Sequence, residues 1–422
     1  MLGLITARRF GPLFVTQFLG AFNDNLFKTA FVFLVTFRLR ADDPVGAATL
    51  ATVAAGVFIA PYVLFSGLAG SLADRRDKAA IARWVKLAEI LFMGLGAGAL
   101  ALESEALCLA VLALMGLHST IFGPVKYAVL PQHLRAEELL LGTGLVEGAT
   151  FVAILLGQIA GGLLSTRDAA IAAITVAVVG WLASRLIPPA PPETPGPVQF
   201  NPLTTTRAAL AMAFSNRSLA TATLAISWFW ALGAVYTSQF VPLARNNLGG
   251  NEAVATLFLA AFSVGVALGS GLVSRLLRGR VSVRLAAPAG LVMALAGLDL
   301  YFAEGAFAAL PALDVPSFLA RPAGWRVMAD LTVLAIAGGI FSVPLYGVLQ
   351  TATPAGSRAS AIAANNIVNA AFQIAAVLAI GVALSFGATV PLVLAGAGLT
   401  ILVLLPWLRG FPSGEAAAKP RG

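Results

Sequence analysis

The feature that most constrains this chain is a series of twelve apolar stretches, each about twenty residues or longer. A helix needs an apolar run of this length to cross the hydrocarbon core of a bilayer, which is roughly 30 Å thick. Hydrophobic residues make up 59% of the chain and charged residues only 11%, which excludes an ordinary soluble domain. The sequence predicts an all-α membrane protein with spans at 10–37, 47–72, 79–101, 106–130, 139–165, 168–188, 219–245, 252–277, 281–303, 327–351, 357–385 and 388–408.

The N-terminus and the single cysteine indicate no further chemistry. Residues 1–10 form a short basic lead, and the apolar run after them is too long for a cleavable signal, so we expect the first span to be retained. Cys108 lies in an apolar run and indicates neither a disulfide framework nor a metal site. We predict no metal and no resident cofactor, and leave open a coupling ion, Na⁺ or H⁺.

The net charge of +8 reflects membrane topology and predicts no nucleic-acid partner. Six basic residues fall in loops on one side of the predicted spans: Arg38, Arg40, Arg167, Arg245, Arg321 and Arg326. Nineteen fall at the termini and in the opposite loops: Arg8, Arg9, Arg75, Arg76, Lys78, Arg83, Lys86, Arg135, Arg185, Arg207, Arg217, Arg275, Arg278, Arg280, Arg284, Arg358, Arg409, Lys419 and Arg421. The positive-inside rule therefore predicts that both termini are cytoplasmic.

A proline-rich segment, IPPAPPETPGPVQFNP at residues 187–202, interrupts the series after the sixth span. We predict an N-terminal six-helix bundle (1–188), a cytoplasmic linker with a possible surface helix (189–218), a C-terminal six-helix bundle (219–408) and a cytoplasmic tail (409–422). The halves also resemble each other. FLGAFNDN at 18 recurs as ALGAVYTS at 231, FGPVKYAVL at 122 as FSVPLYGVL at 341, and GLVEGA at 144 as NIVNAA at 366, at offsets of 213, 219 and 222. This repeat predicts two related bundles.

The loop after the second span reads GSLADRRDKAA and resembles the cytoplasmic loop signature of the major facilitator superfamily. Gly70, Asp74, Arg75 and Lys78 fit this signature, in which glycine permits close helix approach and the aspartate caps or faces the next helix's N-terminus. Asp77 departs from it, because the signature prefers glycine there.

Charged side chains inside the predicted spans are the candidate functional residues, because a charge at mid-bilayer costs about 2.5–3.5 kcal/mol on insertion scales. Gln17, Asp24 and Lys28 share one face of the first helix, at i, i+7 and i+11. Lys126 and Glu147 enter from the same side at similar depth, so they could pair. Lys86, Glu89 and His118 are interpreted as topology or packing residues.

The C-terminal half offers neutral polar groups at corresponding places. Thr237, Leu345 and Asn369 are the counterparts of Asp24, Lys126 and Glu147. Candidate ligands in this half are Tyr236, Gln239, Asn365, Asn369 and Gln373. We therefore predict a central cavity with one ionic wall and one hydrogen-bonding wall.

Six motifs carry a more specific resemblance: GAFNDNLFK, FGPVKY, GLVEGATFVAILLGQIAGG, SWFWALGAVYTSQF, FSVPLYGVLQ and IAANNIVNA. Together they resemble the bacterial lysophospholipid transporter family of the major facilitator superfamily, nearest the subgroup fused to a 2-acylglycerophosphoethanolamine acyltransferase. The resemblance implies a flippase of the bacterial cytoplasmic membrane that moves lysophosphatidylethanolamine and related lipids from the outer to the inner leaflet. It also implies that a separate acyltransferase acts in the same pathway, with membrane lipids as the other partners.

Carried over by motif, Asp24, Asn25, Lys126 and Glu147 would bind substrate or act as gating residues. Some family members have an arginine in the seventh helix, whereas this chain has Gln239 near that place. A headgroup phosphate would then need Lys126 or Lys28.

Two other functions stay open at this point. One is a cation-coupled exporter of amphiphilic drugs or small metabolites, and the other is a non-transporting scaffold for a separate acyltransferase. Costly buried charges argue against the scaffold. Neither a phosphate-cradling G-x-x-x-x-G-K-[ST] loop nor the four-residue-spaced His and Asp of acyltransferases is present, so we do not predict an enzyme.

Overall fold

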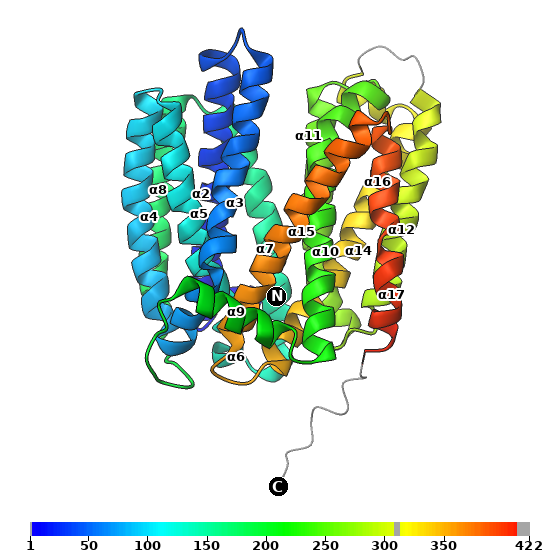
Figure 1. The fold of residues 1–422 in the computed structure, drawn as a ribbon. Coiled ribbons are helices and arrows are strands. Elements are labelled where there is room, and N and C mark those ends of the chain that lie inside the picture. Colours follow the sequence, from blue (N-terminus) through cyan, green and yellow to red (C-terminus); the bar gives the residue numbers. More distant parts are fainter. Residues whose placement is uncertain (1, 308–312, 412–422) are drawn as a thin grey trace. The chain divides into compact units, whose positions relative to one another are not determined.

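Twelve helices long and apolar enough to cross a membrane are present in residues 2–307 and 313–411, the part of the chain that the computed structural model describes (Figure 1). They confirm the predicted all-α membrane fold and its twelve spans. The predicted tail lies outside the described residues except for 409–411, as do Lys419 and Arg421.

The chain divides into two units: Met1–Ser215 with Leu349–Ile367, and Asn216–Val348 with Val368–Gly422. The first unit contains α1 (Leu2–Ile5), α2 (Gly11–Leu34) continued by the π-helix η1 (Val35–Leu39), α3 (Pro44–Arg75), α4 (Lys78–Ala101), α5 (Glu105–Ala128), α6 (Leu130–His133), α7 (Ala136–Leu163), α8 (Thr166–Arg185) and α9 (Pro202–Ala213). The short helix expected in the linker is thus present as α9, which lies beside α3 (Figure 1).

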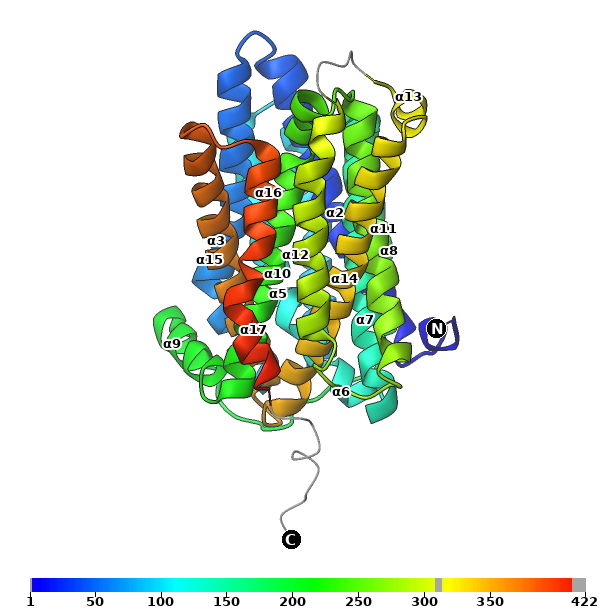
Figure 2. The same ribbon diagram turned by 90° about the vertical axis from the view of Figure 1, so that its right-hand side faces the viewer.

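The second unit contains α10 (Arg217–Pro242) with η2 (Leu243–Asn247), α11 (Glu252–Leu276), α12 (Ala286–Ala303), η3 (Glu304–Phe307), α13 (Val315–Leu319), α16 (Val390–Leu399) and α17 (Ile401–Arg409). Figure 2 shows α12 beside α16 and α17, which contact it. Two helices cross the boundary between the units: α14 (Pro322–Ala352) after residue 348 and α15 (Arg358–Ser385) after residue 367. No pattern in the sequence indicates that these helix ends belong with the first unit.

Short polar side chains set where several spans begin. Asp43, Asp77 and Ser104 each accept a hydrogen bond from a backbone N–H in the first turn of the helix that follows. Asn216 and Thr389 do the same for α10 and α16. Such caps satisfy donors that would otherwise have no partner at a helix start. Polar caps before apolar runs therefore explain the position of these boundaries.

The close contact of α2 and α7 depends on two glycines one turn apart. A Cβ at Gly157 would lie 2.4 Å from the Phe22 carbonyl oxygen, and one at Gly161 would lie 2.6 Å from the Leu26 carbonyl oxygen. Any larger residue at either place would push the two backbones apart. This approach brings the charged positions of α2 and α7 into one interior.

Candidate functional site

Asp24 lies in the middle of α2 and is only 9% exposed. Its Oδ2 accepts a 2.5 Å hydrogen bond from the Ser119 hydroxyl of α5, whereas Oδ1 has no hydrogen-bond partner among the described residues. Lys28, one turn further along α2, lies over the ring of Phe58 at 5.6 Å from its centroid. Within the described ranges no ion pair of 4.0 Å or less joins Asp24 to Lys28, although the two interact electrostatically.

Glu147 is completely buried in α7 and accepts a hydrogen bond from the Tyr127 hydroxyl of α5. Its second oxygen, Oε2, has no hydrogen-bond partner in the part of the chain that the structure describes. Lys126 lies 5.0 Å from the centroid of the Tyr127 ring. It interacts electrostatically with both Glu147 and Asp24. Lys126 and Glu147, which could pair by sequence, form no ion pair of 4.0 Å or less among the described residues, and the hydroxyl of Tyr127 donates to Glu147.

These four charged residues therefore gather inside one unit, from α2, α5 and α7. Two amides of α2 have different kinds of partner. Asn25 donates to the Ala21 carbonyl of the same helix at 2.8 Å, whereas Gln17 accepts from Thr150 of α7 at 3.1 Å. The shared face predicted for Gln17, Asp24 and Lys28 thus meets different neighbours along its length. Two carboxylates and two ammonium groups in one apolar interior can bind a ligand that carries both signs of charge.

A second polar cluster interacts electrostatically with Asp24 and was not predicted. Lys86 and Glu89 of α4 and His118 of α5 are at most 4% exposed. Lys86 and Glu89 form an ion pair, and His118 Nε2 lies 3.1 Å from Glu89 Oε2. Asn23 of α2 donates to Glu89 Oε1 at 2.8 Å. The interpretation of Lys86 and Glu89 as packing or topology residues did not include these contacts. The i, i+3 pair inside the predicted span 79–101, together with His118, was the signal for this cluster.

The polar residues of the second unit form hydrogen bonds within their own helix or to other helices of that unit. Asn369 Oδ1 accepts from the Ser227 hydroxyl at 2.7 Å, and Gln373 donates to the Asn369 carbonyl at 3.3 Å. Tyr236 is fully buried and donates to the Leu394 carbonyl of α16 at 3.2 Å, so it has a structural partner here. Gln239 donates to its neighbour Ser238 at 3.2 Å.

Asn365, the remaining candidate, belongs to the first unit through the start of α15. It is fully buried, and neither side-chain polar atom has a hydrogen-bond partner within residues 2–307 and 313–411. The residues predicted for one wall of a cavity are therefore divided between the two units.

Comparison with known proteins decides the family. The sequence profile of the Major Facilitator Superfamily matches residues 13–377. The chain belongs to this superfamily. It is 28% identical over 342 residues to a protein named lysophospholipid transporter LplT from Enterobacter sp. (strain 638), covering 79% of this chain and 78% of the relative. An LplT from Klebsiella pneumoniae subsp. pneumoniae is 29% identical over 350 residues, with the same coverage.

Two solved structures share the superfamily fold at 14% sequence identity. The human organic anion transporter MFSD10 (TETRAN) has a TM-score of 0.77, covering 94% of this chain and 99% of that one. A variant of the Escherichia coli fucose:proton symporter FucP has a TM-score of 0.69, covering 95% of this chain and 97% of that one. The chain is therefore a multi-pass membrane transporter of the superfamily.

The superfamily loop signature makes a contact that differs from the predicted one. Asp74 accepts hydrogen bonds from the N–H groups of Ala359 and Ser360, both at 2.9 Å, and from the Ser360 hydroxyl at 2.6 Å. It thus faces the N-terminus of α15 and not that of the next helix, α4. Asp77, which departs from the signature, caps α4 through Ala80 N–H at 2.8 Å. Close approach at Gly70 is confirmed, since a Cβ there would lie 2.8 Å from the Ser360 Cα.

The other residues of the loop signature hold the linker. Arg75 donates to the Thr194 carbonyl at 2.9 Å, and the backbone N–H of Lys78 donates to the Ala190 carbonyl at 2.9 Å. Glu193 of the linker pairs with Arg358 at 2.8 Å, beside the residues that Asp74 binds. In this superfamily member the linker is therefore attached to the helix ends within the first unit.

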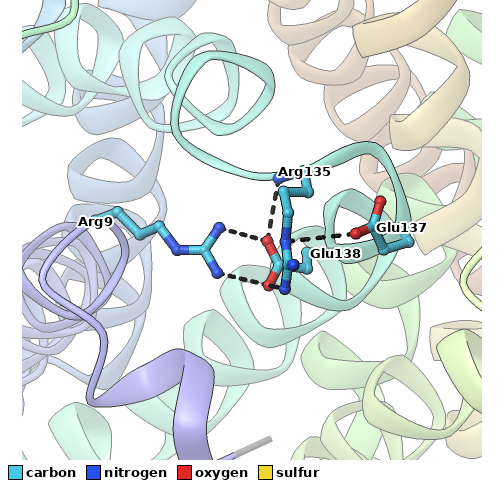
Figure 3. A network of polar contacts seen from close by, with 4 residues as sticks. All are labelled: Arg9, Arg135, Glu137 and Glu138. Atoms are coloured by element: carbon cyan, nitrogen blue, oxygen red, sulfur yellow. Dashed lines mark hydrogen bonds and ion pairs between the residues drawn. The ribbon is translucent and has the colours of Figure 1, made fainter.

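A further ionic cluster joins the segment before α2 to the start of α7 in this superfamily member. Arg9 donates to both carboxylate oxygens of Glu138 at 2.5 and 2.6 Å, and Arg135 donates to the same carboxylate at 2.8 Å (Figure 3). Glu137 pairs with Arg135 at 3.4 Å. The hydrogen bonds to Glu138 raise the pKa of Arg9. All four groups lie at the surface end of α7, apart from the buried site.

Proposed function

We propose that this superfamily member transports lysophospholipids, chiefly lysophosphatidylethanolamine, from the outer to the inner leaflet of a bacterial cytoplasmic membrane. The proposal rests on one observation: both signs of charge are held together inside the membrane by Asp24, Glu147, Lys126 and Lys28. The named LplT relatives, at 28–29% identity, support the same substrate class.

The chemistry of the headgroup matches this set of charges. A phosphoethanolamine group carries a phosphate anion and an ammonium cation, and each needs an opposite charge where water is scarce. Asp24 Oδ1 and Glu147 Oε2 have free acceptor capacity within the described residues for an ammonium group. Lys126 and Lys28, held over aromatic rings, would receive the phosphate. The acyl chain needs only apolar surroundings.

Transport would proceed by alternating access, in which the bundles 1–188 and 219–408, joined by 189–218, move about the site. Both termini would lie in the cytoplasm. A separate acyltransferase would consume the delivered lipid.

A liposome assay tests this function. Purified protein is reconstituted into vesicles, fluorescent lysophosphatidylethanolamine is added to the outer leaflet, and its arrival in the inner leaflet is followed by loss of access to a quencher. We expect faster transfer than in protein-free vesicles, and slower transfer with Asp24→Ala or Glu147→Gln. Arg135→Gln, which changes an exposed charge outside the site, is the matched control. Transfer at the protein-free rate would refute the proposal.

A cation-coupled exporter is the second candidate, favoured by the same free oxygen atoms of Asp24 and Glu147, which can bind H⁺ or Na⁺. The two candidate functions predict different responses of transport to an imposed ion gradient. Export driven by an imposed H⁺ or Na⁺ gradient, with amphiphilic cations as substrates and without lipid transfer, would favour this alternative.

A further inference from the structure

The cluster of Lys86, Glu89 and His118 is buried away from bulk water. Glu89 is 1% exposed and Lys86 is 0% exposed. Replacing a buried ion pair by apolar residues is often neutral or stabilising, so its presence calls for another explanation. The cluster is joined to the candidate site by two links: Asn23, which bonds Glu89 and precedes Asp24, and Ser119, which follows His118 and donates to Asp24.

Lys86 lies in a slot between α2 and α8 that two glycines leave open. A Cβ at Gly20 would lie 3.3 Å from the Lys86 Nζ, and a Cβ at Gly180 would lie 3.1 Å from the same atom. Gly20 and Asp24 are one turn apart on α2 and so share a face of that helix. The ammonium group therefore lies against α2 one turn from the Asp24 carboxylate, with which it interacts electrostatically.

This geometry offers Lys86 two carboxylates, and Glu89 is the one with which it pairs. An ammonium group buried without a partner is strongly unfavourable. If Glu89 lost its charge, the Lys86 side chain would gain most by turning to Asp24. Asp24 would then be neutralised from inside the protein and would not be accessible to a ligand.

We propose that Glu89 is a positioning residue whose task is to bind Lys86 and so keep the Asp24 carboxylate accessible. His118 and Asn23 fix the Glu89 carboxylate from the other sides, at 3.1 and 2.8 Å. The inference deepens the proposed function, and its transport consequences rest on the role of Asp24 in that function.

The transport test is a suppressor experiment. Glu89→Gln is expected to slow lipid transfer by about tenfold or more, the size of coupling expected between residues in contact. Lys86→Gln added to Glu89→Gln removes the competing cation, and transfer should return to within about threefold of wild type. A double variant at least as slow as the single one would overturn the inference. Rescue by Lys86→Gln is also expected of a merely structural ion pair, so the stability cycle with Asp24→Asn separates the two roles.

A stability cycle tests the same idea without transport. Asp24→Asn is introduced into wild type and into Glu89→Gln, and melting temperatures are followed by intrinsic tryptophan fluorescence. The loss should be larger in the Glu89→Gln background, because there Asp24 has become the partner of Lys86. Glu105→Gln, which removes the same charge but from a pair with Arg40, is the control background and should leave the effect of Asp24→Asn unchanged. Equal losses in all three backgrounds would refute the inference, whatever the substrate is.

Discussion

Removing the Asp74 carboxylate should destabilise the start of α15 by more than the loss of a single helix cap destabilises its helix. Asp74 is 3% exposed and accepts three hydrogen bonds, two from backbone N–H groups of the first α15 turn and one from Ser360. Asp74→Ala would leave these donors without partners inside the protein. The expected loss is about 3–5 kcal/mol, the range for removing one member of a buried charged interaction.

The comparison variant is Asp43→Ala, which removes one exposed cap of α3. Asp43 accepts a single backbone hydrogen bond, from Gly46, and its side chain is 60% exposed. Loss of such a cap costs about 1 kcal/mol. Asp74→Asn, which keeps an acceptor but no charge, should fall between the two.

Thermal unfolding of the purified protein in detergent measures this order. Wild type should melt highest, followed by Asp43→Ala, Asp74→Asn and Asp74→Ala. If Asp74→Ala melts with or above Asp43→Ala, the three hydrogen bonds do not stabilise the fold as argued, and the role assigned to the loop signature is wrong.

The remaining predictions concern other contacts. Tyr127→Phe removes the donor to Glu147 and should lower stability by about 1–3 kcal/mol, the cost of an unsatisfied buried acceptor; thermal unfolding checks it, and an unchanged melting temperature would contradict that hydrogen bond. Gly157→Ala should lower the free energy of unfolding by about 1–3 kcal/mol, because its Cβ would meet the Phe22 carbonyl. Gly94→Ala, with open space around it, should be tolerated. Equal melting temperatures of the two variants would refute the close contact of α2 and α7. Arg9→Gln should leave lipid transfer near the wild-type rate, because Arg9 lies at the surface end of α7; a loss comparable to that of Asp24→Ala would place Arg9 in the transport pathway.

The spans could be predicted because hydropathy is a local property, and one helix length of apolar sequence suffices to show it. The charged residues of the site could be predicted for the same reason: Asp24, Lys126 and Glu147 stand out against apolar neighbours. Their partners could not. Which oxygen or nitrogen reaches Asp24 depends on the rotation of α5 against α2, and Ser119 is too ordinary a residue to attract attention.

The contacts of Lys86 and Glu89 could not be predicted for a different reason. Their place near the start of the predicted span 79–101 indicates packing or topology residues in the cytoplasmic part of that helix. Depth along a helix can be read from sequence, but the direction in which a side chain points relative to the neighbouring helices cannot. Asp74 illustrates the same limit, because its partners Ala359 and Ser360 are 285 and 286 residues away.

The tyrosines at corresponding places of the repeat, Tyr127 and Tyr346, are used in opposite senses. Tyr127 gives its hydroxyl hydrogen to Glu147, whereas Tyr346 receives a 2.8 Å hydrogen bond from the indole of Trp230. A phenol can do either, so a tyrosine keeps a hydrogen-bond partner whether the neighbouring group accepts or donates. The place in the first half can therefore hold a carboxylate beside its tyrosine, and the place in the second half an indole, with the same residue at both.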